Sequence, residues 1–118
     1  MKKIFVSYTV RDNIVKKDFL EKVESFLQAY GRPFIDLLHN NSENKQLRVE
    51  TELTESDCLI LINTKDAKKS EWVNKELSIA IKNGIPVFEY DYKKLEEEEF
   101  HPITINIGHW ANGEKRNE

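Results

Sequence analysis

An indole and a carboxylate stand four residues apart in the stretch "SEWVNKEL", which begins at Ser70. On a helix, Trp72 and Glu76 would be neighbours on one face. A single fixed carboxylate can cleave an N-glycosidic bond, because it stabilises or attacks the oxocarbenium-like sugar of the transition state. The adjacent ring can stack on a base or a ribose. Spacing alone leaves a second interpretation open, in which Glu76 is a solvated helix carboxylate and Trp72 a partly buried packing residue.

The residues around this pair predict the helix that carries it. Ser70 is a good N-cap, and Gly84 and Pro86 are typical of the end of a helix that spans about 70–83. We expect the inward side of this helix to carry the apolar residues Val73, Leu77, Ala80 and Ile81.

Four apolar segments predict strands. They are residues 2–8, 33–38, 57–64 and 85–90. The first and third are apolar on both sides, which is typical of buried parallel strands, so we expect them to be adjacent at the centre of the sheet. "PITINI", residues 102–107, is a candidate fifth strand. Beyond it, Trp110 is expected to pin the C-terminal segment onto the domain.

Helical periodicity between these strands predicts two further helices. The first spans about 11–31, with Asp12 as its cap and Gly31 at its end. The second, at 45–56, is weaker, and its expected inward residues are Leu47, Val49 and Leu53.

Alternating strands and helices predict the α/β class, with right-handed crossovers. We expect one domain over residues 1–118, built as a flavodoxin-like, doubly wound and mostly parallel sheet of four to five strands with helices on both faces. Ligands bind such sheets beyond the carboxyl ends of the strands, near the switch point. The residues expected there are Ser7, Tyr8, Asp36, Asn63 and Thr64, and the helix that begins at Ser70 rises from the same edge.

Composition excludes several kinds of protein. The formal net charge of -3 does not favour a nucleic-acid partner, and no apolar run approaches the roughly 20 residues that span a membrane. The single cysteine, Cys58, builds no disulfide framework, which predicts a reducing, cytoplasmic location. The three histidines show no metal-binding spacing, so we expect no metal. No glycine follows the first strand, which excludes a P-loop or a dehydrogenase-type dinucleotide fold.

Three motifs, in this order, resemble the TIR (Toll/interleukin-receptor) domain, in its compact prokaryotic type. "IFVSYTVRD" resembles the first strand of that family and the charged loop after it, and "RPFIDLL" resembles its second strand. "ESDCLILINTKDAKKSEWVNKEL" resembles its third strand and its Ser-x-Trp-x-x-x-Glu-Leu segment, which is the most specific of the three. The resemblance is clearest over residues 2–91.

This resemblance implies an enzyme that cleaves NAD+ at the nicotinamide bond, as a glycohydrolase or a cyclase, with Glu76 as the catalytic residue. NAD+ would be the substrate, with no separate cofactor. The resemblance also implies self-association through TIR–TIR contacts, in which the loop from His39 to Lys45 takes part, and a role in antiphage defence signalling. The residues that it places on the substrate side are Ser7, Tyr8, Arg11, Asp36 and Trp72.

Two other functions stay open at this point. One is a TIR interaction module or scaffold without enzymatic activity. The other is an enzyme similar to nucleoside deoxyribosyltransferases. The stretch "KELSIAIKNGIPVFEY" resembles a segment of those enzymes in which a glutamate-bearing helix is followed by glycine, proline and a strand. That enzyme would also use Glu76 on a sugar, so only the substrate, a free nucleoside or NAD+, separates it from the first function.

Overall fold

A computed structural model describes residues 2–111 of the chain, apart from the side chains of residues 105, 109 and 111. Four parallel strands form one sheet in the order β2-β1-β3-β4. The strands are β1 (Lys3–Ser7), β2 (Arg32–Ile35), β3 (Cys58–Asn63) and β4 (Val87–Asp91). The helices are α1 (Lys17–Leu27), α2 (Asp36–His39), α3 (Lys45–Thr54), α4 (Glu71–Lys82), α5 (Tyr92–Glu97) and α6 (His101–Ala111), with a short 3-10 helix at Ala67–Lys69.

The predicted flavodoxin-like fold is confirmed. β1 and β3 are the adjacent central strands, with Phe5 opposite Leu59 in the register. From β1 the chain goes to one side to form β2, then returns across β1 to form β3 and β4. The switch point therefore lies between β1 and β3, and the residues that follow these strands border it.

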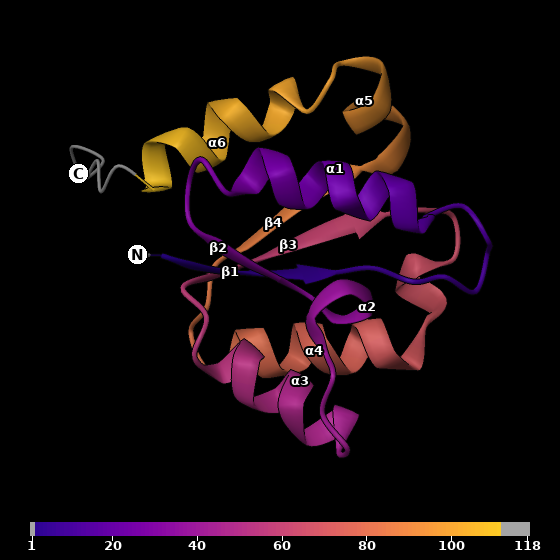
Figure 1. Ribbon diagram of the computed structural model, residues 1–118, viewed down its shortest axis with the longest axis vertical. Helices are drawn as coiled ribbons and strands as arrows, with labels where there is room; N and C mark the ends of the chain where they lie inside the picture. The colour runs from indigo at the N-terminus through magenta and orange to yellow at the C-terminus, as the bar shows by residue number, and fades with distance from the viewer. Residues whose placement is uncertain (1, 112–118) are drawn as a thin grey trace.

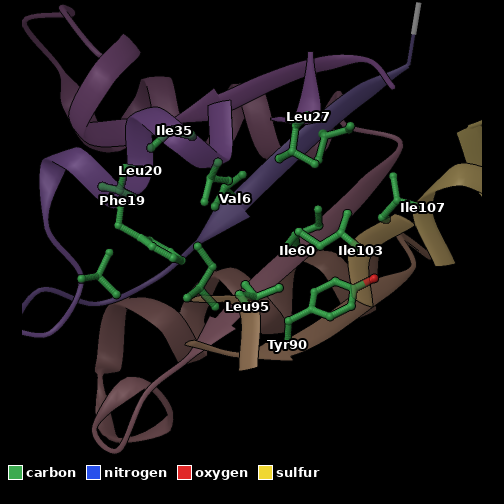
Figure 2. Packing of buried hydrophobic residues seen from close by; sticks show 14 of the residues in the cluster. Val6, Phe19, Leu20, Leu27, Ile35, Ile60, Tyr90, Leu95, Ile103 and Ile107 are labelled. Carbon is green, nitrogen blue, oxygen red and sulfur yellow. The ribbon is translucent and has the colours of Figure 1, made fainter. Parts of the chain in front are cut away.

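Helices cover both faces of the sheet: α1, α5 and α6 lie on one side, and α3 and α4 on the other (Figure 1). Side chains along β1 alternate between the two faces of the sheet, so that each face has an apolar layer for its helices. Ile4 and Val6 face the α1 side, while Phe5 faces α3 and α4. Figure 2 shows the α1-side core, in which strand residues Val6, Ile60 and Tyr90 lie among Leu20 and Leu27 of α1 and Ile103 and Ile107 of α6.

The candidate fifth strand is wrong, because residues 102–107 belong to α6. Ile103 and Ile107 are both fully buried, and their spacing of four puts them on one helix face against the sheet. Packing therefore overrides the strand propensity of the isoleucines. Trp110 is half-buried against this core and its ring lies 6.3 Å from that of Phe88, so it does pin the C-terminal helix.

The first predicted helix begins later than expected, at Lys17, so Asp12 does not cap it. Asp12 instead accepts hydrogen bonds from the hydroxyl of Thr64, at 2.6 Å, and from the backbone N–H of Asp66, at 3.1 Å. These bonds tie the loop after β1 to the loop after β3. The second strand is also shorter than predicted, because Asp36 opens α2.

Two residues of the predicted inward stripes are exposed. Leu47 on α3 is 57% exposed and Ile81 on α4 is 74% exposed. On α4 the buried residues are Val73, Glu76 and Ala80, at spacings of three and four. The acidic Glu76 is therefore part of the buried stripe, in which the prediction placed only apolar residues. No helix of the described residues combines the length and apolar character that crossing a membrane requires.

The β2 edge of the sheet is closed to further strands. Pro33 has no backbone N–H to offer, and the N–H of Ile35 is donated to Nδ1 of His39 at 2.8 Å. Because Nδ1 accepts, the ring proton lies on Nε2, which pairs with the carboxylate of Glu24 on α1. One histidine therefore blocks the edge and joins α1 to α2.

Replacing this histidine should destabilise the fold. His39→Ala leaves the Ile35 N–H without its acceptor, and we expect a loss of about 1–3 kcal/mol in the free energy of unfolding by urea. His101→Ala is the matched control, because that histidine is exposed at the start of α6. Equal urea midpoints for the two variants would show that the His39 bond contributes nothing to stability.

Candidate functional site

A cleft of about 310 Å³ opens at the carboxyl edge of the sheet, between the segments that follow β1 and β2 and the first turns of α4. Five of the six predicted site residues line it together: Tyr8, Arg11, Asp36, Trp72 and Glu76. The sixth, Ser7, is 1% exposed and lies beneath Glu76, to which it donates a hydrogen bond. Thr64, expected at this edge, is bonded to Asp12 instead.

Sequence reasoning missed the apolar rim of the cleft. Val10 and Leu37 line it and are 57% and 54% exposed, beside Trp72 at 38%. One signal was available, since Val10 is an apolar residue in a polar loop and fits no helix or strand stripe. The other lining residues that the prediction did not assign are Val6, Thr9 and Ser70.

Glu76 is 4% exposed, so its interpretation as a solvated helix carboxylate is wrong. Burial raises the pKa of Glu76 from 4.5 to about 7, because loss of hydration disfavours the charged form, and the negative charge of Asp36 adds to the rise. The hydrogen bond from Ser7 and the Trp72 side chain oppose it. Near neutral pH the carboxyl group therefore exchanges between its charged and neutral forms.

The hydroxyl of Ser7 reaches Oε1 of Glu76 at 2.7 Å and joins residues that are 69 positions apart. Ser7 is the last residue of β1, and Glu76 lies in the second turn of α4. Helix α4 is set in place by Ser70, whose hydroxyl accepts the N–H of Val73 at 3.3 Å. The cap and the buried stripe together orient Glu76 toward the end of the central strand.

Two hydrogen bonds fix the β2 side of the cleft. The Tyr8 hydroxyl accepts the N–H of Leu37 at 3.0 Å, and Oδ1 of Asp36 accepts from the amide of Asn40 at 2.7 Å. Burial raises the pKa of Tyr8 to about 12, so its hydroxyl stays protonated. That proton is free to be donated elsewhere, because the hydroxyl is an acceptor toward Leu37.

A positive charge borders the opposite side. Arg11 is the one cationic residue of the described chain that lines the cleft, and its guanidinium donates to the carbonyl of Lys69 at 3.2 Å. Most of its donors remain for an anionic group. Among the side chains that the structure describes, no group of three histidine, cysteine or acidic residues is placed to hold a metal ion.

Fold and site together define an α/β protein of the flavodoxin-like class with a carboxylate cleft at the switch point of its sheet. The family model of the TIR domain matches residues 4–115 of the 118 residues. The chain therefore belongs to the TIR domain family, and the match extends past residue 91 through α5 and α6. No curated protein matches the chain.

The raised pKa of Glu76 predicts a pH-dependent stability difference between the parent and Glu76→Gln. The folded carboxyl group binds its proton more tightly than the unfolded one, so this contribution to stability is complete below about pH 4.5 and is lost as pH rises through about 7. The variant, which carries no charge at either pH, should match the parent near pH 4.5 and be more stable above pH 7, by up to about 3 kcal/mol.

Urea unfolding of both proteins across this pH range measures the difference. A stability gap that does not change with pH would contradict the raised pKa of Glu76.

Proposed function

We propose that the chain is an NAD+-consuming TIR enzyme that breaks the bond between nicotinamide and ribose, as a glycohydrolase or a cyclase. The observation that carries the proposal is the buried carboxylate of Glu76 in a cleft that also presents an aromatic ring and a guanidinium. The family and the fold are compatible with this activity, and the residue types in the cleft suit each part of the substrate.

Cleavage of this bond needs a negative charge beside the sugar. Nicotinamide leaves as a neutral ring, because the bonding electron pair neutralises the pyridinium, and the ribose carbon becomes oxocarbenium-like. The Glu76 carboxylate stabilises that positive charge in a site of low hydration, where the interaction is strong. Water then attacks the carbon in a glycohydrolase, and another atom of the same molecule attacks it in a cyclase.

The remaining lining residues suit the rest of NAD+. The Trp72 ring, 38% exposed at the rim, offers a face on which a planar ring or the ribose can stack. Arg11 carries donors that suit a phosphate. Asp36 carries acceptors that suit ribose hydroxyls.

Cleft size supports a second part of the proposal, which is self-association. A volume of about 310 Å³ is at the low end for small-molecule pockets, and the apolar rim residues Val10 and Leu37 stay exposed. We propose that a neighbouring subunit completes the pocket. The loop from His39 to Lys45 would then rearrange, and the Asn40 bond to Asp36 connects that loop to the cleft.

The exposed rim also favours a second candidate function, a TIR interaction module in which another protein covers Val10 and Leu37. The cellular setting that we propose is the cytoplasm, in agreement with a single buried and free cysteine. A role in bacterial antiphage defence signalling rests on the family resemblance alone.

Removing the charge of Glu76 should abolish NAD+ cleavage. Glu76→Gln keeps the shape of the side chain but not its charge, and loss of one preorganised electrostatic contact costs roughly a hundredfold or more in rate. The parent's kcat/KM should rise with pH through about 7 as Glu76 loses its proton. Chromatography and mass spectrometry of the products measure both. Trp110→Ala is the control and should keep activity, because Trp110 packs against Phe88 away from the cleft.

Three results would contradict this function. A Glu76→Gln variant as active as the parent would remove Glu76 from the chemistry. A parent without NAD+ turnover, even when crowded or assembled, would favour the interaction module. Processing of free deoxynucleosides in place of NAD+, with the same sensitivity to Glu76→Gln, would favour the deoxyribosyltransferase-like function.

Self-association predicts that turnover per molecule depends on protein concentration. Diluting the parent over three orders of magnitude should lower the specific activity, because the equilibrium shifts to monomers with an incomplete pocket. A crowding agent should restore part of it. Specific activity that stays constant across the dilution series would show that the monomer is sufficient by itself.

A further inference from the structure

Ser7 differs from the other buried serines of the described chain. Ser56 donates its hydroxyl proton to the backbone carbonyl of Glu52, and the hydroxyl of Ser70 accepts a backbone N–H to cap α4. Ser7 alone of the three bonds a carboxylate, on an element 69 residues away. A buried hydroxyl needs a partner, but satisfaction alone does not require an ionisable one.

We propose that Ser7 is a positioning residue of the site: its hydroxyl fixes Oε1 of Glu76 and favours the anionic carboxylate that acts on the sugar. The inference rests on the proposed function and deepens it. Ser7 does not line the cleft, so it acts through Glu76 and not on the substrate.

Two consequences follow from the geometry. At 2.7 Å the Ser7 hydroxyl holds Oε1 of the carboxylate and so limits the orientations that the group can take. A hydrogen bond from a hydroxyl is also stronger to a charged oxygen than to a neutral one, so Ser7 stabilises the charged form of Glu76.

The surroundings of Glu76 otherwise favour its neutral form. Glu76 is 4% exposed, and the charged and titratable residues that border the cleft with it are Tyr8, Arg11 and Asp36. Burial and the Asp36 charge both raise the pKa of Glu76, while Ser7 and, to a smaller extent, the Trp72 side chain lower it. Without the Ser7 hydroxyl, the pKa of Glu76 would rise further, and a smaller fraction of the carboxyl group would carry the charge near neutral pH.

Titration of the Glu76 carboxyl carbon by ¹³C NMR tests the proposal without any substrate. We expect Ser7→Ala to raise the midpoint by about one pH unit, which is what a hydrogen bond to a charged group contributes at the low end. Ser7→Thr keeps the hydroxyl and should keep the midpoint near that of the parent. Ser56→Ala removes a buried hydroxyl with a bond of the same 2.7 Å length and should leave the midpoint unchanged.

The pH profile of NAD+ cleavage is the second readout. The pH of half-maximal kcat/KM should move upward in Ser7→Ala by the same amount as the NMR midpoint, and it should stay in place in Ser56→Ala. An unchanged or lowered NMR midpoint in Ser7→Ala would overturn the proposal, and so would a shifted midpoint with an unshifted rate profile. A parent that does not cleave NAD+ would contradict the proposed function, while the NMR shift would still support the action of Ser7 on Glu76.

Discussion

Glu76 holds an ionisable carboxyl group at 4% exposure, where the loss of hydration opposes its charge. Much of the architecture around the switch point bears on this one group. The stripe of α4 includes it among Val73 and Ala80, so folding itself removes it from water. The end of β1 supplies the compensating hydroxyl of Ser7, while the segment after β2 supplies the like charge of Asp36, which disfavours ionisation of Glu76. The folded state is therefore more stable with Glu76 neutral, whereas the proposed chemistry needs Glu76 charged.

Parallel topology explains why residues so far apart in the sequence can meet here. All strands end at one edge, so the segments after β1 and β2 and the helix after β3 converge on the same cleft. Asp12 joins the segment after β1 to the loop after β3 by accepting hydrogen bonds from Thr64 and the Asp66 N–H. Tyr8 joins the same segment to the one after β2 by accepting the N–H of Leu37. The rim that these bonds leave exposed is apolar, as expected of a surface that a ligand or a second subunit covers.

The fold could be predicted because its central strands are apolar on both faces, and the helix that carries the most specific motif begins at a clear cap, Ser70. Five of the six predicted residues line the cleft, because Trp72 and Glu76 lie on that helix while the other three follow the ends of two parallel strands. Other features depend on contacts that no local pattern encodes. Residues 102–107 read as a strand but become helical against the α1-side core, and the apolar pattern of α4 gave no reason to bury Glu76 in place of Ile81. The Ser7 bond and the rim residue Leu37 likewise appear only when distant segments are brought together.

Binding of NAD+ to the inactive Glu76→Gln variant, followed residue by residue by NMR, tests the central claim most directly, since it asks where the substrate binds without allowing it to react. The claim predicts saturable shifts for the Trp72 indole and for the backbone of Val10 and Leu37, with none at the cavity on the far edge of the sheet that Arg32 and Arg48 line. Shifts confined to that second cavity, or no shifts with NAD+ at any protein concentration, would contradict the assignment of this cleft as the site of NAD+ cleavage.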